Sequence, residues 1–255
     1  MNPKYLEFRK FASDLVINAS KVIIEERENL KIVKEKDLQD IATSADLASE
    51  KYIINRIKES YPDHSILSEE QGEINNKSKY RWIIDPLDGT KEYVRNLPFY
   101  NISVALEYDG KLVASALYRP GEKTLFSASK GEGSFKGEFQ IVPSATQSLD
   151  KCFIYFYVPS YQRSPESYDM AFEKIKLLGK NVYRLRGMSD ENTAMCWVAQ
   201  GAVDAYINLS DKPKLHDIAT GIMIASESGA VVDTSKYPLI VCANEKIYNQ
   251  ISEII

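Results

Sequence analysis

An apolar run that ends directly in two closely spaced aspartates constrains the fold and the chemistry of this chain more than any other feature. The run Trp82–Ile84 leads into the segment Asp85-Pro-Leu-Asp88-Gly-Thr90. The end of a strand that carries two carboxylates three residues apart can aim both at one point. Pro86 fixes the turn, and Gly89 lets the backbone come close to a ligand. The segment therefore predicts a ligand site at the end of a buried strand, in preference to a surface turn rich in Asp and Gly.

The same segment indicates chemistry with cations and phosphate. If a helix or turn begins at Asp88, its free N–H groups face outward and suit a phosphate. Carboxylates cannot hold a phosphate by themselves, whereas Mg²⁺ accepts both carboxylate and phosphate oxygens. The chain has two histidines, His64 and His216, and its three cysteines lie far apart without a Cys-x-x-Cys pair, which disfavours a zinc site. Metal ligands in this chain are therefore expected to be oxygens.

Three further places bring carboxylates to the ends of predicted elements. Asp46 follows Thr43, and Thr43-x-x-Asp46 is also the pattern of a helix capping box. The pair Glu69-Glu70 follows the apolar run Ser65–Leu67, although paired glutamates commonly lie on solvated surfaces. Asp217 begins a predicted helix, where the helix dipole alone favours an acid. Each signal is weak by itself, and the functional argument rests on their order and context together.

Hydrophobic periodicity divides the chain into a part rich in antiparallel strands and a part that alternates strands and helices. Asp109-Gly110 joins two apolar runs as a two-residue hairpin turn. The first part is predicted to contain helices at 5–28 and 43–60 and strands at 65–68, 80–84, 101–108, 111–118 and 124–129. The second part is predicted to contain strands at 152–157, 182–185, 205–208, 230–233 and 239–242 and helices at 165–178, 190–200, 216–228 and 245–254. This pattern predicts two lobes of layered α and β structure, residues 1–143 and 144–255, which share one core.

Length and composition bound the class of protein. The 255 residues are 44% apolar and 27% charged with a net charge of −4, which is typical of a soluble globular protein. Interspersed charges of both signs disfavour a nucleic-acid or anionic-membrane binder. No apolar run approaches the roughly 18 residues of a membrane span, and the first residues carry charges where a signal peptide needs apolar side chains. We therefore expect a cytoplasmic protein that does not bind nucleic acid or membranes.

Four segments together resemble the inositol monophosphatase superfamily of magnesium-dependent phosphatases. Trp82-Ile-Ile-Asp85-Pro-Leu-Asp88-Gly-Thr90 matches the most specific signature of that superfamily. Ile41-Ala-Thr-Ser-Ala-Asp46 is similar to its Thr-x-x-Asp segment, and Ser68-Glu-Glu70 is similar to its Gly-Glu-Glu. Asp217-Ile-Ala-Thr-Gly221, followed by Glu227-Ser-Gly229, is similar to its last acidic block. The resemblance covers nearly the whole chain and implies the layered αβαβα sandwich of the sugar phosphatases, an α+β fold with an antiparallel-sheet N-terminal lobe and a mixed α/β C-terminal lobe.

The resemblance also implies a set of metal ligands. Glu69, Asp85 and the Leu87 carbonyl would hold one Mg²⁺. Asp85 would bridge to a second ion, which Asp88 and Asp217 would also hold. A third, weaker ion would lie near Glu69, and Mn²⁺ is a possible substitute for Mg²⁺. Two or three such ions lower the pKa of bound water and neutralise charge that builds up on a phosphoryl group.

A catalytic pair and a phosphate site follow from the same resemblance. Water positioned by Thr90, with Asp46 behind it, would attack phosphorus in line, since Thr90 is too weakly acidic to act as a base by itself. The N–H groups of Gly89 and Thr90 would hold phosphate oxygens, and Asp88 would also border the substrate. Glu70 matches the second glutamate of the family motif and is a secondary candidate for the metal site.

The expected pocket for the leaving alcohol departs from the family pattern. Ser189-Asp-Glu-Asn192 stands where the family often has Gly-Ser-Ala-Ala, and Asn208 stands where inositol-specific members carry a Glu that contacts the sugar. His216 stands where a Trp often precedes the last metal aspartate. Ser189 and Asn208 are therefore candidate substrate-binding residues. Arg184 and Arg186 are candidates for contact with a second phosphate, although solvated charges at a strand edge are the plainer interpretation.

The resemblance implies a phosphoric monoester hydrolase that acts on inositol-1-phosphate, fructose-1,6-bisphosphate or both, like the compact archaeal-type dual enzymes, and that forms a homodimer. A 3′-phosphoadenosine-5′-phosphate phosphatase of the same superfamily is an alternative. A non-catalytic relative that binds a metal or a phosphometabolite is another, favoured only by the altered segment 189–192. A haloacid-dehalogenase-type phosphatase is disfavoured because its two acids are separated by one residue, not two. An aspartic protease needs two Asp-Thr-Gly copies, which the chain lacks.

Overall fold

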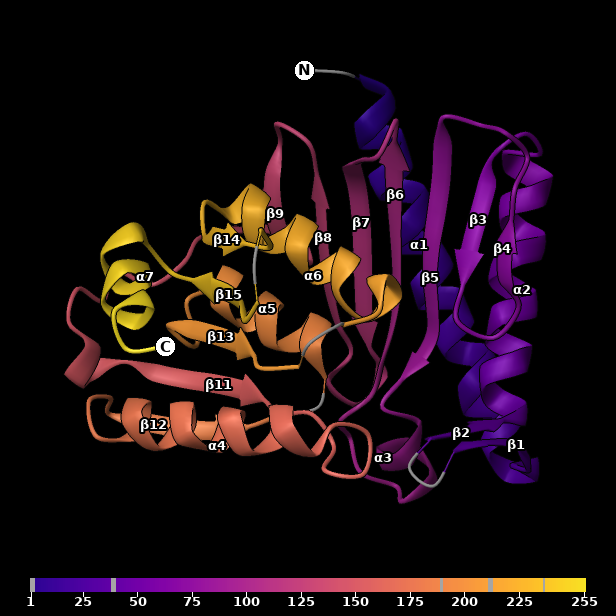
Figure 1. Cartoon of the computed structure of the whole chain (residues 1–255). Helices are drawn as coiled ribbons and strands as arrows, with labels where there is room; N and C mark the ends of the chain where they lie inside the picture. Colours follow the sequence, from indigo (N-terminus) through magenta and orange to yellow (C-terminus); the bar gives the residue numbers. More distant parts are fainter. Residues whose placement is uncertain (1–2, 38–39, 189, 211–212, 236) are drawn as a thin grey trace.

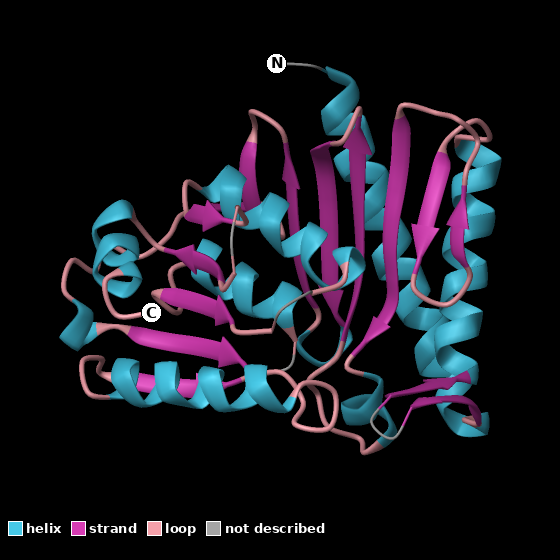
Figure 2. Cartoon of the chain, in the orientation of Figure 1, coloured by secondary structure: helices cyan, strands magenta, loops and turns pink. Residues whose placement is uncertain are grey.

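An eight-stranded and a five-stranded β-sheet alternate with layers of helices in the computed structural model of the chain (Figure 1, Figure 2). The structure describes residues 3–37, 40–188, 190–210, 213–235 and 237–255. From the outer face of the larger sheet to the outer face of the smaller one, the helices are α1 (Pro3–Glu26) with α2 (Ser44–Ser60), α5 (Glu191–Ala199) with α6 (Leu215–Ser228), and α4 (Pro165–Gly179) with α7 (Glu245–Ser252). The predicted αβαβα sandwich is confirmed.

The larger sheet has eight strands in the order β10-β9-β8-β7-β6-β5-β3-β4. They are β3 (Ser65–Ser68), β4 (Gly72–Ile74), β5 (Tyr80–Asp88), β6 (Asn101–Tyr108), β7 (Lys111–Arg119), β8 (Thr124–Ser129), β9 (Gly133–Lys136) and β10 (Phe139–Ile141). All neighbours are antiparallel except β3 and β5, which run parallel. The predicted β6–β7 hairpin turns at Asp109 and Gly110, whose φ angles of 52° and 74° are those that a two-residue turn requires.

The smaller sheet has five strands in the order β12-β11-β13-β15-β14. They are β11 (Phe153–Tyr157), β12 (Arg184–Gly187), β13 (Ala205–Asn208), β14 (Val231–Asp233) and β15 (Leu239–Cys242). β11 pairs in parallel with β12 and β13, whereas β15 is antiparallel to β13 and β14. The sheet is therefore mixed, as predicted for the C-terminal lobe.

Alternating side chains of β5 bury both faces of the larger sheet. Trp82 and Ile84 are fully buried in the cluster formed with α1 and α2, whereas Ile83 packs toward Ala219 of α6. Successive side chains of a strand point to opposite faces, so a strand covered on both sides is apolar throughout. The strand that carries the two aspartates is therefore clamped between two helical layers.

The structure extends or shifts several predicted elements. β5 continues to Asp88, four residues beyond its predicted end, and the strand predicted at 182–185 lies at Arg184–Gly187. Short elements that were not predicted are β1 (Ile32–Asp37), β2 (Asp40–Thr43), β4, β9, β10 and α3 (Thr90–Val94). Among the described residues, no helix is long and apolar enough to cross a membrane. The division into lobes after residue 143 stays a prediction. α6 packs against strands of both sheets.

Candidate active site

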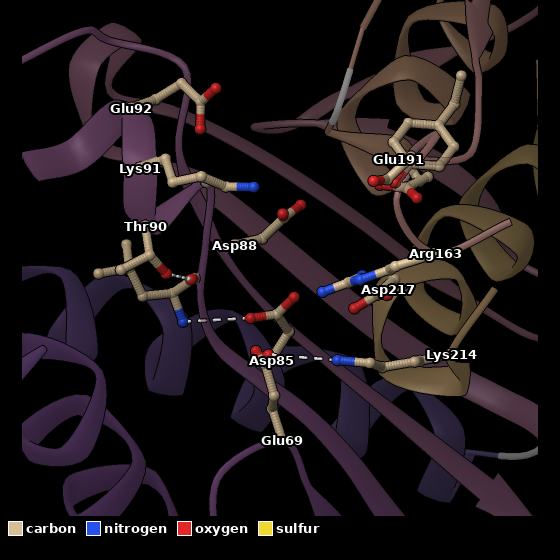
Figure 3. Close-up of a pocket in the computed structure, with 14 residues that line it drawn as sticks. Glu69, Asp85, Asp88, Thr90, Lys91, Glu92, Arg163, Glu191, Lys214 and Asp217 are labelled. Atoms are coloured by element: carbon tan, nitrogen blue, oxygen red, sulfur yellow. Dashed lines mark hydrogen bonds and ion pairs between the residues drawn. The ribbon is translucent and has the colours of Figure 1, made fainter. Parts of the chain in front are cut away.

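A polar pocket opens where β5 ends (Figure 3). Residues of the larger sheet, its loops and α3 form one wall: Glu69, Asp85, Leu87, Asp88, Gly89, Thr90, Lys91 and Glu92. The second half of the chain forms the other wall: Tyr157, Ser160, Arg163, Glu191, Lys214 and Asp217. The predicted metal ligands and the predicted phosphate-binding backbone therefore lie in one pocket, with acids from both halves of the chain.

An irregularity in β5 lets both aspartates reach this pocket. Asp85 pairs with Ser103 and Asp88 with Asn101 of β6, so β5 has one extra residue between the two pairs. Residues three apart on a regular strand would point to opposite faces, and the extra residue removes that conflict. The Leu87 N–H donates to Oδ1 of Asp85 at 3.2 Å, and Nδ2 of Asn101 donates to Oδ2 of Asp88 at 2.9 Å. These bonds hold both carboxylates at the end of the strand.

Gly89 makes the sharp turn from β5 into α3. Its φ of +82° lies in the left-handed region, and a Cβ at this position would collide with the carbonyl oxygen of Phe99. Only glycine adopts this backbone conformation without strain and clash. The Gly89 carbonyl then accepts a hydrogen bond from the Tyr93 N–H at 2.9 Å, which starts α3 directly after the turn.

Asp46 makes both of the contacts that were expected of it, with Thr43 and with Thr90. One carboxylate oxygen, Oδ2, accepts hydrogen bonds from the Thr43 N–H, at 2.8 Å, and from the Thr43 hydroxyl, completing a capping box at the start of α2. The other oxygen, Oδ1, accepts a hydrogen bond from the Thr90 hydroxyl at 2.9 Å. Thr90 Oγ1 also lies 3.0 Å from the Leu87 carbonyl. Burial raises the pKa of Asp46, and the hydrogen bonds from Thr43 and Thr90 oppose that shift.

The next residues of α2 hold the other loops of the pocket. The Ser49 hydroxyl donates to the Pro86 carbonyl at 2.7 Å, which fixes the turn between the two aspartates. Oε1 of Glu50 accepts from the Ser68 hydroxyl and from the N–H groups of residues 70 and 71, at 3.0 and 3.1 Å. Glu50 is only 1% exposed, so its carboxylate is committed to these donors. One helix therefore positions the turn that carries Glu69 as well as the end of β5.

The acids of the pocket repel one another strongly. Burial, followed by the nearby Glu69 and Asp217, raises the pKa of Asp85 well above its ordinary value. Burial and the neighbouring acids, Asp190 first among them, do the same for Asp88. Carboxylates crowded in this way are stable as anions only when cations neutralise them. Among the described residues, no three His, Cys, Asp or Glu side chains are placed so that together they could hold one metal ion. The donor set is nevertheless the hard-oxygen type that Mg²⁺ takes.

Basic side chains temper the negative charge of the pocket. Lys214 Nζ lies 3.9 Å from Oε1 of Glu69 and links the two walls, and Lys91 and Arg163 line the same space (Figure 3). His216 Nε2 lies 3.2 Å from Oδ1 of Asp217, so the residue that replaces the family's usual Trp contacts a predicted metal ligand. The mixture of acids and bases suits a ligand that carries its own negative charge.

Comparison with known proteins assigns the family. The sequence profile of the inositol monophosphatase family matches residues 4–252. The chain belongs to this family. It is 34% identical over 209 residues to the Nus factor SuhB of Pasteurella multocida, covering 82% of this chain and 76% of that protein. It is 30% identical over 260 residues to a fructose-1,6-bisphosphatase/inositol-1-monophosphatase of Aquifex aeolicus, covering 98% and 95%. The crystal structure of the extragenic suppressor protein suhB of Bartonella henselae superposes with a TM-score of 0.86 at 27% identity, over 94% and 95% of the two chains.

Not every residue that was predicted to bind substrate lines the pocket. Arg184 is exposed, with its guanidinium 5.5 Å from the ring of Tyr183, and is not among the lining residues. Arg186 lines a separate groove beside Trp197. Both residues lie on β12, which is an edge strand of the smaller sheet and begins two residues later than predicted. Asn208 is fully buried behind the lining residue Glu191.

The pocket gives no support for the roles predicted for Ser189 and Glu70. Ser189 lies outside the described residues. The side chain of Glu70 is not among those that line the pocket, and its backbone N–H bonds to Glu50. Asp46 does not line the pocket and reaches it through its hydrogen bond with Thr90. The roles predicted for Asp46 and for the lining residues, as metal ligands, catalytic pair and phosphate contacts, stay predictions.

Several lining residues were not predicted from the sequence. Tyr157, Ser160 and Arg163 lie at the end of β11 and in the loop that follows, where no local motif marks them. Glu191 lies inside the segment that departs from the family pattern, which was the available signal. Lys214 precedes Asp217 by three residues and enters the pocket through the same turn of α6.

Proposed function

We propose that the chain is a Mg²⁺-dependent phosphomonoesterase that hydrolyses a small sugar or inositol phosphate. The observation that carries this proposal is the convergence of Asp85, Asp88 and Asp217 on one pocket, where burial first and then repulsion by neighbouring acids raise the pKa values of Asp85 and Asp88. Membership of the inositol monophosphatase family supports phosphatase chemistry. Such acids need cations, and a cation-filled pocket that also carries Lys91 and Arg163 suits a phosphate ester.

Five oxygen-bearing residues are assigned to the metal site. Glu69, Asp85 and the Leu87 carbonyl would hold one Mg²⁺, and Asp85, Asp88 and Asp217 would hold another, with Mn²⁺ as a substitute. Bound metal ions of this kind activate water and neutralise charge on the transferred phosphoryl group. A third ion near Glu69 is part of the proposal.

Thr90 and Asp46 are assigned the positioning of the attacking water. Because the Thr90 hydroxyl donates its hydrogen to Asp46, its lone pairs are left to accept a hydrogen bond from water. Asp46 is itself held by the capping box, so the direction of the Thr90 hydroxyl is fixed before substrate binds. When water loses a proton, that proton passes to the Thr90 oxygen as the Thr90 hydroxyl proton passes to Oδ1 of Asp46, which becomes the protonated acid. The N–H groups of Gly89 and Thr90 are assigned to the phosphate oxygens.

The candidate substrates are inositol-1-phosphate and fructose-1,6-bisphosphate, with 3′-phosphoadenosine-5′-phosphate as the alternative. The exposed Arg163 and the neighbouring Lys214 are the cations of the pocket that a second phosphate could reach. A non-catalytic binding protein has no use for a water-positioning pair, so the pairing of Thr90 with Asp46 favours an enzyme.

The proposal is tested by incubating the full chain with each of the three esters in Mg²⁺, in Mn²⁺ and in EDTA, and measuring released phosphate. Turnover of at least one ester that requires the metal ion supports the proposal and names the substrate. Binding of the esters without any turnover would contradict the proposal and favour the non-catalytic binding protein.

Two further properties belong to this proposal through the family resemblance. We expect a homodimer, which light scattering of the purified chain measures. We also expect a cytoplasmic enzyme that does not bind nucleic acid. Because relatives carry the name Nus factor, a filter-binding assay with structured RNA tests that last expectation directly.

A further inference from the structure

Asn101 joins two carboxylates through a single side-chain amide. It is the first residue of β6 and is fully buried. Its Nδ2 group donates to Oδ2 of Asp88 and to Oδ1 of Asp190, both at 2.9 Å. An amide nitrogen carries two hydrogens, so each of these hydrogen bonds uses one of them. Asn101 therefore holds Asp190, which lies in the segment that departs from the family pattern, beside an aspartate of the proposed metal site.

The charge of Asp190 has a fixed place in the fold. Its Oδ1 also accepts a hydrogen bond from the Thr193 N–H at 2.9 Å, which makes Asp190 the cap of α5. The N-terminus of a helix favours a negative charge, and N–H donors of this kind bind the carboxylate form. The side chain of Asp190 is only 2% exposed. The protein therefore keeps this acid as a buried anion one amide group away from Asp88.

No basic side chain in the described part of the chain neutralises Asp190 directly. Its Oδ2 is buried without a hydrogen-bond partner, and Asp190 forms no ion pair with a described Lys, Arg or His. The buried Arg119 acts on Cys196 in the opposite direction to Asp190, but its guanidinium is paired with Glu122 at 2.9 Å. A buried anion without a cation is costly, and a cation bound nearby removes that cost.

The charge of Asp190 acts strongly on Asp88. After burial, Asp190 is the largest cause of the raised pKa of Asp88. The charge that attracts a proton to Asp88 also attracts a divalent cation, and at equal distance it attracts the divalent cation twice as strongly. The balance favours the metal ion over the proton. Asn101 meanwhile keeps the two repelling carboxylates in place, because it donates to both.

We propose that Asp190 strengthens the binding of a divalent cation at Asp88 by its charge, and that Asn101 is the positioning residue that holds the two acids together. This inference rests on the proposed phosphatase function and adds two residues to its metal site. Asp88 lines the pocket and Asp190 does not, so Asp190 acts without touching the ion. The departure from the family pattern at Asp190 then supports metal binding, whereas the non-catalytic alternative takes it as a sign of lost activity.

Binding of Mn²⁺ to the metal-free full chain tests the inference without any substrate. The electron paramagnetic resonance signal of free Mn²⁺ is measured during titration of the wild type and of Asp190→Asn, which keeps an oxygen to cap α5 but removes the charge. Asp204→Asn is the matched control, because Asp204 is also a buried acid, 7% exposed, that accepts a backbone N–H. Asp204 precedes β13, at the opposite end of that strand from Asn208, which contacts the pocket residue Glu191.

We expect Asp190→Asn to raise the Kd of one bound Mn²⁺ by about 10- to 100-fold, and Asp204→Asn to change no Kd. The double variant Asn101→Asp with Asp190→Asn returns the charge to the pair and should bind Mn²⁺ more tightly than Asp190→Asn alone, which a purely structural role of Asp190 would not explain. Unchanged Mn²⁺ binding in Asp190→Asn, or an equal loss in Asp204→Asn, would overturn the inference. A folded double variant that binds no better than Asp190→Asn would contradict the role of charge.

Failure of the proposed function is separable from failure of this inference. A wild type that binds Mn²⁺ but hydrolyses no ester contradicts the phosphatase activity, while the Kd values still decide the role of Asp190. A wild type that binds no Mn²⁺ contradicts the metal site and this inference together. Metal-dependent hydrolysis with equal Kd values in the wild type and Asp190→Asn would overturn the inference alone.

Discussion

The hydroxyl of Thr90 donates a hydrogen bond to Oδ1 of Asp46 across 44 positions of sequence, at 2.9 Å. The second oxygen of the same carboxylate is fixed by Thr43 at the start of α2. The hydroxyl to which we assign the positioning of water is thereby oriented by an acid that also caps a core helix. The local cost of burying Asp46 is offset by hydrogen bonds that serve folding and positioning together.

Replacing Thr90 by Val should abolish the positioning of water while preserving shape. We expect kcat to fall by about 10²- to 10⁴-fold, the usual contribution of a positioned proton-transfer group. Steady-state phosphate release measures the effect. Thr43→Val is the comparison variant, because it keeps the Thr90 hydroxyl but removes the Thr43 hydroxyl that binds Asp46; it should lower Tm and reduce kcat less than Thr90→Val does. If Thr90→Val kept wild-type kcat, the role assigned to the pair would be wrong.

Gly89→Ala should damage both the fold and the site. The new Cβ meets the Phe99 carbonyl in a backbone conformation of φ +82°. Gly110→Ala is the matched control, because Gly110 has φ +74° with nothing within 4 Å of the added Cβ. The control bears only the strain of the left-handed conformation, about 1–2 kcal/mol. Urea unfolding should show a larger loss for Gly89→Ala, with loss of turnover, and equal losses would contradict the clash.

Glu50→Ala should weaken metal binding from a distance. Loss of the acceptor releases the turn at residues 70–71, and with it the neighbouring Glu69. We expect the Mg²⁺ concentration for half-maximal activity to rise by about 10- to 100-fold, as for other residues that orient metal ligands. Glu59→Ala, an exposed change on the same helix, should leave it unaltered. An unchanged Mg²⁺ requirement in Glu50→Ala would contradict the role of Glu50 in holding the turn at residues 70–71.

The sequence predicted most of the fold because its long elements have strong patterns. The β6–β7 hairpin, with its Asp109-Gly110 turn, and α2, with its Thr43 cap, were found where periodicity and local turn chemistry agree. The β5 bulge could not be predicted, because register depends on the partner strand. Short strands such as β9 and β10 form because they pair with each other, and they have too few residues for hydrophobic periodicity to be recognised.

The site was predicted only where a local motif marks it. Asp85 and Asp88 follow an apolar run, whereas Tyr157 and Arg163 reach the pocket from the end of β11 and the loop beyond it, through tertiary packing that no spacing encodes. Arg184 was predicted near the pocket because its strand was expected to lead into it. On the actual edge strand β12 the side chain is exposed to solvent.

The pH dependence of stability should carry a contribution from His64. Its Nδ1 accepts a hydrogen bond from Nε1 of Trp82 at 3.1 Å, and its ring stacks on Tyr61 and Tyr80. Burial, and then the charge of Lys4, lowers the pKa of His64 from 6.5 to about 4. The unfolded chain therefore binds a proton in this interval that the folded chain does not, and stability falls as the pH decreases from about 6.5 to 4.

The contribution is measured by urea unfolding across that interval for the wild type and His64→Gln. The Gln carbonyl can still accept from Trp82 but does not titrate, so the variant should lose less stability between about pH 6.5 and 4. Parallel pH profiles for the two proteins would contradict the assignment of this proton to His64.

Asp88→Asn should stabilise the metal-free protein. Asp88 faces several buried acids, and an amide of the same shape removes the repulsion while it can still accept the hydrogen bond from Asn101. We expect a Tm in EDTA raised by a few degrees, since about 1 kcal/mol corresponds to about 2–4 °C at this size. The rise in Tm on adding Mg²⁺ should shrink. Asp109→Asn, at an exposed turn, should change neither, and a lower Tm for Asp88→Asn in EDTA would contradict the repulsion.

Release of phosphate from the preferred ester by the wild type, Asp88→Asn and Asp217→Asn tests the central claim most directly. Both variants remove one charge from the proposed metal site, one from each wall of the pocket. At saturating Mg²⁺ we predict that each loses at least about 100-fold in kcat/KM, roughly 2.7 kcal/mol of transition-state stabilisation, with an intact fold by circular dichroism. Wild-type activity in EDTA, or either variant within a few-fold of the wild type, would contradict the account.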